Sequence, residues 1–205
     1  PETPVYLSRV DYHAAVVNSK ALAIAQLDSA YTVEGGLISI DSLGLPNGLL
    51  VDNAMPLVQK YIPLPEDNER LITLKKAQDS LLSVGLTSIV DAGLSLEQLE
   101  SLKKFYTEDS LKIRNYAMIA GNPHSIAKFV KDGFYETDKL TIKSVKLLAD
   151  GALGSRGACL LTHYQDSPTQ GFLLHSPQEL DDAIKTLAKS KFQVNTHAIG
   201  DSANR

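Results

Sequence analysis

Apolar and polar positions in the last two thirds of the chain switch between a helical period and a strand period. Leu71, Leu74, Ala77, Leu81 and Leu82 follow helical spacing over residues 66–84, and Gly85 ends this pattern. Four strands then alternate with four helices. The strands are predicted at 86–91, 111–119, 141–150 and 193–197, and the helices at 94–106, 122–131, 176–189 and 199–205. Because alternating strands and helices form parallel sheets with right-handed crossovers, we expect an α/β fold.

The first 65 residues follow a different pattern. Asn18 is a good N-cap for a helix over residues 20–27. Two weakly alternating segments, 32–40 and 48–52, are separated by turn residues and predict a β-hairpin, and a short helix is expected at 53–61. We therefore expect a small α+β insertion subdomain over 1–65 and barrel-type β/α units over 66–205, truncated at the C-terminus. Four units cannot close an eight-stranded barrel, so we expect a piece of a larger protein.

Two of the predicted strands carry polar, ionisable residues on one face. With a period of two, Val145, Leu147 and Ala149 lie on one side of the third strand, whereas Lys146 and Asp150 lie on the other. The strand over 193–197 repeats this arrangement, because Gln193, Asn195 and His197 share a side. In barrels of parallel strands, residues at the carboxyl ends of strands form the site of chemistry. We therefore regard these two strand ends as the candidate site.

Lys146 is the first candidate, because an unpaired charged lysine inside a sheet costs several kcal/mol. Three arrangements remove this cost. The lysine forms an ion pair with Asp150 or with an acidic residue on a neighbouring strand, its pKa is lowered, or its neutral amine takes up carbon dioxide. The resulting carbamate is an anionic ligand that can bridge two cations. The spacing of residues alone leaves these alternatives open, and the ion pair is the simplest of them.

His197 is better placed to bind a metal. It ends a strand, and a neutral imidazole is a good zinc ligand. The alternative is a histidine that only forms hydrogen bonds at the end of the sheet. Around it, the polar turn from Asp150 to Arg156 is suited to an anionic substrate group, and His13 can face the site from outside the sheet. A nucleotide site is disfavoured, because the chain has neither a Walker loop nor a GxGxxG fingerprint.

Composition excludes several other classes of protein. Hydrophobic residues make up 43% of the chain and charged residues 21%, as in ordinary globular proteins. The net charge of −4 provides no basic field for nucleic acid or an anionic membrane. No apolar run approaches the roughly 20 residues of a membrane span and no signal peptide opens the chain, so we expect a cytoplasmic location. Cys159 is the only cysteine, which excludes an intrachain disulfide.

Several segments together resemble a known family. They are PVYLSRVDYHAAVVNSKAL (4–22), GLLVD (48–52), GLTSIVDAG (85–93), VKLLADGALGSR (145–156) and VNTHAIGD (194–201). In this order they look like the YtcJ-like branch of the amidohydrolase superfamily (amidohydrolase family 3), and the similarity covers essentially the whole chain.

The resemblance implies a metal-dependent hydrolase on a (β/α)8 barrel, which cuts C–N bonds of non-peptide amides or cyclic amides. Lys146 matches the carboxylated lysine of the family and His197 matches a metal-binding histidine, so both are expected to be catalytic and to bind a divalent metal, most simply zinc. The metal would acidify a bound water and polarise the substrate carbonyl. The resemblance makes Asp150, Arg156 and His13 candidate substrate contacts for a small amide-type molecule.

The chain also departs from the family pattern. The family's first-strand His-x-His pair is not in this sequence, and its sixth-strand histidine and eighth-strand aspartate would lie beyond Arg205. A catalytic zinc needs about three protein ligands. We therefore expect these 205 residues alone to bind no metal firmly, to be inactive and to keep Lys146 as an amine. Exposed barrel edges predict self-association, as a dimer. The alternative function is a non-catalytic binding or assembly domain, and a phosphate-binding module using residues 150–156 is a weaker one.

Overall fold

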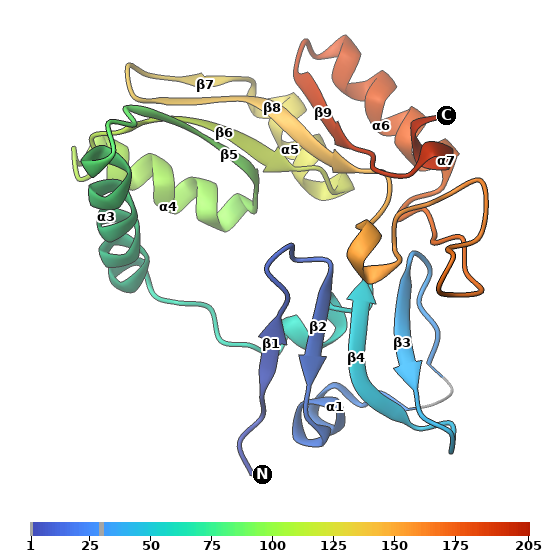
Figure 1. The fold of residues 1–205 in the computed structure, drawn as a ribbon. Helices are drawn as coiled ribbons and strands as arrows, with labels where there is room; N and C mark the ends of the chain where they lie inside the picture. Colours follow the sequence, from blue (N-terminus) through green and yellow to red (C-terminus); the bar gives the residue numbers. More distant parts are fainter. Residues whose placement is uncertain (1, 29–30) are drawn as a thin grey trace. The chain divides into compact units, whose positions relative to one another are not determined.

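The computed structural model describes residues 2–28 and 31–205, which form two compact units (Figure 1). The first unit comprises Pro1–Pro63, Leu148–Ser176 and His197–Arg205, and we call it the antiparallel unit. The second comprises Leu64–Leu147 and Pro177–Thr196, and we call it the α/β unit. The sequence suggested one boundary after residue 65. In the structure, residues 148–176 and 197–205 group with the first 63 residues instead of with the α/β unit.

The antiparallel unit is built on a four-stranded sheet in the order β1-β2-β4-β3 (Figure 1). Its strands are β1 (Tyr6–Ser8), β2 (Ala14–Val17), β3 (Gly36–Ile40) and β4 (Pro46–Asp52), and its helices are α1 (Ser19–Ala25), α2 (Pro56–Gln59) and α7 (Asp201–Asn204). All three strand pairs are antiparallel, and Ala14 lies opposite Val51. Asn18 caps α1 as predicted, because its side chain accepts a hydrogen bond from the Ala21 N–H at 3.1 Å. Buried apolar side chains of β2, β4, α1 and α2 form the core.

The α/β unit contains a mainly parallel sheet with helices packed against it. Its elements are α3 (Asp67–Ser83), β5 (Ser88–Leu94), α4 (Leu96–Thr107), β6 (Arg114–Ala120), α5 (Pro123–Asp132), β7 (Tyr135–Glu136), β8 (Leu140–Leu148), α6 (Pro177–Lys189) and β9 (Gln193–His197). β5 pairs with β6 and β6 pairs with β8 in parallel, and β9 also pairs with β8. The predicted alternation of strands and helices and the predicted parallel sheet are therefore confirmed.

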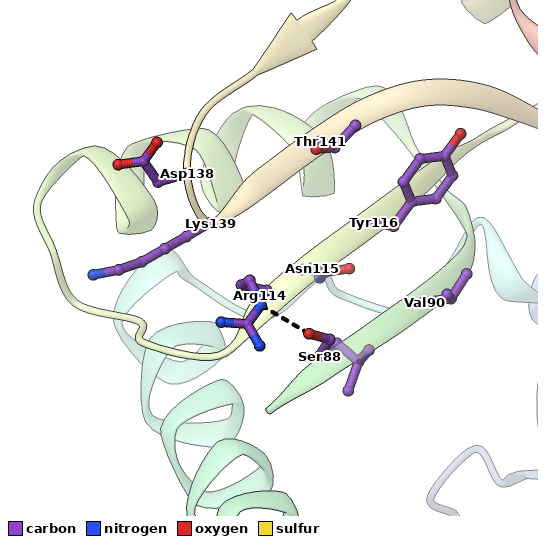
Figure 2. Close-up of a pocket in the computed structure, with 9 residues that line it drawn as sticks. Ser88, Val90, Arg114, Asn115, Tyr116, Asp138, Lys139 and Thr141 are labelled. Atoms are coloured by element: carbon purple, nitrogen blue, oxygen red, sulfur yellow. Dashed lines mark hydrogen bonds between the residues drawn. The ribbon is translucent and has the colours of Figure 1, made fainter. Parts of the chain in front are cut away.

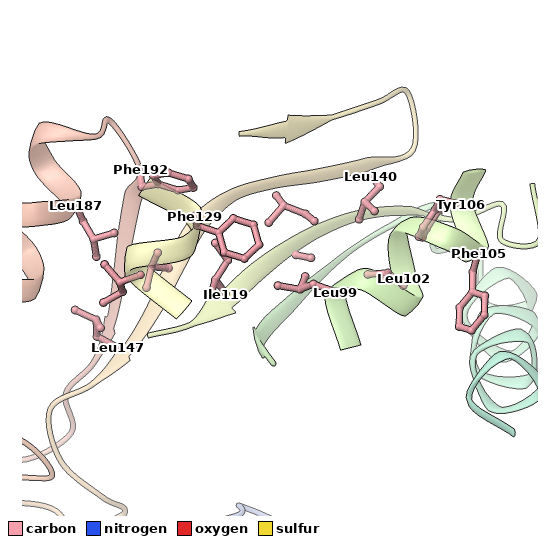
Figure 3. Packing of buried hydrophobic residues seen from close by; sticks show 14 of the residues in the cluster. Leu99, Leu102, Phe105, Tyr106, Ile119, Phe129, Leu140, Leu147, Leu187 and Phe192 are labelled. Carbon is pink, nitrogen blue, oxygen red and sulfur yellow. The ribbon is translucent and has the colours of Figure 1, made fainter. Parts of the chain in front are cut away.

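One face of this sheet forms the core of the α/β unit. Side chains from β6 and β8 pack there against α4, α5 and α6, and Figure 3 shows Leu99, Phe129, Ile119 and Leu187 among them. Each fully buried side chain of this size contributes about 1.5–3 kcal/mol. Val145 and Leu147 belong to this core, whereas Lys146 between them is only partly buried. The alternation predicted around Lys146 is therefore confirmed.

The sequence missed three strands and set some boundaries differently. β7 pairs antiparallel with β8, and β1 and β2 form where extended chain and loop were expected. α2 is a four-residue helix, shorter than the predicted segment 53–61. β8 ends at Leu148, two residues before the predicted end of that strand at Asp150. The long connection after it contains a short 3-10 turn, η1 (Leu153–Ser155).

None of the helices in the described part of the chain is long and apolar enough to cross a membrane.

Candidate strand-end site

Five residues of the antiparallel unit converge at the ends of strands. They are His13, Asp52, Gly151, Gly157 and His197, and we call them the strand-end cluster. His13 directly precedes β2, Asp52 ends β4 and His197 ends β9. Gly151 and Gly157 flank the turn that contains η1. Segments far apart in the sequence therefore supply one small group of residues, in which His13, Asp52 and His197 carry the polar side chains.

The pairing of β2 with β4 brings His13 and Asp52 together. Ala14 lies opposite Val51, and the next pair along the strands is His13 and Asp52. The Asp52 N–H donates to the His13 carbonyl at 3.2 Å. The side chains meet as well, with 2.6 Å between His13 Nδ1 and Asp52 Oδ1. A distance this short is typical of a charge-assisted hydrogen bond.

Asp52 is held in a confined place. Its side chain is 1% exposed, and its φ of +46° lies in the left-handed region that few residues other than glycine adopt. A Cβ added to Gly151 or Gly157 would lie only 2.2 or 2.1 Å from Asp52 Oδ2. Glycine at both positions therefore makes room for the carboxyl. Burial raises the pKa of Asp52, while the hydrogen bond with His13 acts in the opposite direction.

His197 lies beside His13 in this cluster. The two imidazole rings stack with their centroids 5.0 Å apart and their planes inclined by 29°. His197 Nε2 is 3.1 Å from the Gly151 carbonyl oxygen, so that nitrogen carries the proton in this arrangement. His197 Nδ1 is then the nitrogen available as a metal ligand. Both alternatives considered for His197, a hydrogen-bonded histidine and a ligand, are compatible with this geometry.

Asp150 lies beside the cluster but points into the protein. It is completely buried, and its two oxygens accept hydrogen bonds from three backbone N–H groups. Oδ1 accepts from Ile199 at 2.9 Å, and Oδ2 accepts from Cys159 and Gly200 at 2.8 Å each. The carboxylate therefore ties the end of β8 to the segment that follows His197. This geometry directs the side chain toward the backbone and not toward a substrate.

Arg156, the other sequence candidate in this turn, is exposed. Its guanidinium forms a two-pronged ion pair with Asp166, with Nε–Oδ1 and Nη2–Oδ2 distances of 3.1 and 2.7 Å. Asp166 raises the pKa of Arg156. Arg156 would have to leave this surface pair, or share it, in order to bind an anionic group.

Lys146 belongs to the α/β unit. Its side chain lies on the face of the sheet opposite the apolar core, and a Cβ on Gly93 would lie 3.5 Å from its Cγ. That distance is an ordinary van der Waals contact, so the lysine stem lies directly beside Gly93. Among the described residues of this unit, no carboxylate forms an ion pair with Lys146. Asp91 of β5 lines a hollow with α3 and α4, on the helix side of the sheet.

The residues that the structure describes do not by themselves form a metal site. No group of three or more His, Cys, Asp or Glu residues among them is arranged to hold a metal ion. A catalytic zinc usually has three protein ligands. The donors among the described residues therefore fit only part of a metal site.

A hollow of about 320 Å³ at the other end of the parallel strands is not a good candidate for this site. Figure 2 shows that Ser88, Arg114 and Thr141, at the beginnings of β5, β6 and β8, line it, with a hydrogen bond from Arg114 to Ser88. Lys146 is near the end of β8. In barrels of parallel strands, active sites form at the carboxyl ends and the amino ends serve stability.

A comparison with protein-family models matches residues 1–205 to the amidohydrolase family. The chain belongs to this family. Among curated proteins, this amidohydrolase-family chain is 33% identical to Protein LONG AFTER FAR-RED 3 of Arabidopsis thaliana and 32% identical to the putative amidohydrolase YtcJ of Bacillus subtilis. These alignments cover 100% and 99% of the chain, but only 37% and 39% of the two relatives. The chain thus spans well under half the length of the relatives it matches.

Solved structures agree with this assignment. The chain is similar to uncharacterized metal-dependent hydrolases from Pyrococcus horikoshii and Pyrococcus furiosus, with TM-scores of 0.73 and 0.71 and identities of 28% and 29%. The matches cover 98% and 99% of this chain and 40% and 42% of those proteins. The resemblance to the YtcJ-like amidohydrolases inferred from the sequence is therefore confirmed.

The sequence did not identify Asp52 as a site residue. The segment GLLVD (48–52) carried part of the family resemblance, yet His13, the partner of Asp52, is 39 residues away in the sequence. The sequence predicted that segment 48–52 pairs with 32–40 and predicted no strand next to His13, so nothing placed Asp52 beside it. The contact between Asp52 and His13 follows only from the register in which β2 pairs with β4.

Proposed function

We propose that this chain is the central part of a metal-dependent hydrolase that cuts C–N bonds of non-peptide amides or cyclic amides. In the whole protein, β5, β6, β8 and β9 would be four strands of a (β/α)8 barrel. The observation that carries the proposal is the convergence of His13, Asp52 and His197 at strand ends in a chain of the amidohydrolase family. Of these three residues, His197 lies at the carboxyl end of β9, and carboxyl ends of parallel strands are where barrel enzymes place their chemistry.

Lys146 and His197 are the metal-binding residues in this proposal. Lys146 has no acidic partner among the described residues of its own unit, which leaves its amine available for carboxylation. His197 has Nδ1 available while Nε2 faces the Gly151 carbonyl. The remaining ligands would come from residues outside these 205, because one lysine and one histidine do not complete a zinc site. His13 and Arg156 would contact the substrate.

Metal analysis of the whole protein tests this proposal. We expect about one or two equivalents of zinc per chain, with loss of amide hydrolysis when a chelator removes the metal. Lys146→Ala and His197→Ala should each lower the metal content, whereas Lys131→Ala, on the surface of α5, should not. Intact-protein mass spectrometry under native conditions should show the mass of one added carbon dioxide, which Lys146→Ala removes.

A whole protein that binds no divalent metal would contradict the proposal and support a non-catalytic binding or assembly domain. A protein that keeps its full metal content after both substitutions would show that Lys146 and His197 are not ligands.

A further inference from the structure

The strand-end cluster contains Asp52, a residue to which the family resemblance assigned no catalytic or binding role. We propose that Asp52 is a positioning residue, which holds the His13 imidazole by Nδ1 and thereby directs Nε2 toward the substrate. This inference rests on the proposed hydrolase function for its activity readout only, because the orientation of the ring can be measured without turnover.

Asp52 has the fixed geometry that positioning requires. The backbone hydrogen bond between β4 and His13 sets the distance between the two residues. The Cα atoms of Gly151 and Gly157 pack against Oδ2, so the carboxyl has no room to rotate away. Oδ2 is buried and has no hydrogen-bond partner among the described residues. Within the described part of the chain, the carboxylate therefore makes its one polar contact through Oδ1, with His13 Nδ1.

His13 is fixed in a second direction as well. Its ring stacks on the His197 ring, which sets the plane of the imidazole. The Asp52 carboxylate then sets how the ring is rotated within that plane, because it forms a hydrogen bond with Nδ1. Nε2, on the other side of the ring, has no partner among the described residues, and the side chain is 13% exposed. A carboxylate that accepts from Nδ1–H leaves Nε2 unprotonated and able to accept a hydrogen bond.

A merely structural tie between β2 and β4 would also explain the short contact. The two roles differ in their consequences. Positioning requires one tautomer of His13, with the proton on Nδ1, whereas a structural tie is equally served by a neutral carboxyl that donates to Nδ1. Positioning also requires that the whole protein lose turnover when the tautomer changes, even though the fold is retained.

The first test is nitrogen NMR of the imidazoles in the 205-residue chain, labelled with ¹⁵N and measured at a pH where His13 is neutral. We expect His13 Nδ1 to carry the proton in the wild type. In Asp52→Asn, the amide NH2 should turn to Nδ1, because the Oδ2 position offers no acceptor among the described residues, and the proton should move to Nε2. A wild-type His13 protonated at Nε2, or a tautomer unchanged in Asp52→Asn, would overturn the proposal.

The second test is kinetic and uses the whole protein with para-nitroacetanilide, an amide whose cleavage releases a coloured amine. Asp52→Asn should lower kcat by about 100-fold with a smaller change in KM, because misplaced groups lose rate more than affinity. His13→Ala should lose a similar amount, and the double variant should lose little more. Asp132→Asn, which removes an exposed carboxylate of α5, is the matched control and should retain wild-type kcat.

The two arms separate this inference from the proposed function. A whole protein that cleaves the amide while Asp52→Asn keeps wild-type kcat would refute the positioning role and leave the hydrolase proposal intact. A whole protein that cleaves no amide would refute the proposed function, and the NMR experiment would still decide whether Asp52 sets the tautomer of His13.

Discussion

Replacing Asp150 by Asn tests whether its carboxylate holds the end of β8 against the segment after His197. The wild-type carboxylate is fully buried and accepts from the N–H groups of Ile199, Cys159 and Gly200. Asn has the same shape but only one acceptor oxygen. If that oxygen takes the Oδ2 position, it keeps two of the three bonds, and the new NH2 group faces the Ile199 N–H, a second donor.

The cost of this change follows from the number of acceptors lost. Leaving one buried N–H without an acceptor costs about 1–3 kcal/mol, and two donors facing each other raise that cost. We therefore expect Asp150→Asn to lower the free energy that opposes local opening by about 2 kcal/mol, a factor of roughly 30 in the opening equilibrium. Asp150→Ala removes all three acceptors and should cost more.

Amide hydrogen exchange gives a direct assay. Protection of the Ile199 and Gly200 amides should fall by roughly 30-fold in Asp150→Asn. The control is Asp166→Asn, which removes an exposed ion pair with Arg156 and should cost less than about 1 kcal/mol. Unchanged protection of Ile199 and Gly200 in Asp150→Asn would refute the reasoning that these three hydrogen bonds hold the turn.

Three further predictions concern packing, pH and assembly. Gly157→Ala places a methyl group against Asp52 Oδ2 and should lower the free energy of unfolding by about 1–3 kcal/mol. Urea denaturation measures this change, and an unchanged midpoint would contradict the close packing. Burial, together with the charge of Asp91, raises the pKa of Tyr106 to about 12. Because this folded-state pKa lies above the unfolded value near 10, the stability associated with the neutral phenol is present below pH ~10 and is lost as pH rises toward ~12. This loss should be absent in Tyr106→Phe, which urea denaturation at the two pH values measures. We also expect the chain to self-associate through the edge strand β5, so sedimentation velocity at micromolar concentration should show a dimer, and a strictly monomeric species would refute this.

Much of the α/β unit could be predicted from the sequence because its signals are local. The apolar period changes between helix and strand at each boundary, and Asn122 caps α5 by accepting a hydrogen bond from the Ser125 N–H, three residues away. The alternation of side chains along a strand placed Val145 and Leu147 in the core and Lys146 on the opposite face of the sheet. β7 was not predicted, because a strand of two residues is too short to show an alternating pattern.

The candidate site was only partly predictable. The strand pattern selected Lys146 and His197, and the family resemblance gave them metal-binding roles and made His13 a candidate substrate contact. The structure brings His13 and His197 into contact. The period-two pattern also placed Asp150 on the same side of the strand as Lys146. However, side chains alternate between the two sides only within a strand, and β8 ends at Leu148. The chain turns after that point and buries Asp150 among backbone N–H groups.

The sequence by itself determined the alternation of parallel strands and helices in the α/β unit, the core face of β8 and the family. These depend on the spacing of neighbouring residues and on motifs. Only the tertiary structure decided which partners meet across long separations: Asp52 with His13 through the register of β2 and β4, and Asp52 with Gly151 and Gly157 through close packing. The physical reason is that register and packing are set by the whole fold at once, so no local stretch of sequence encodes them.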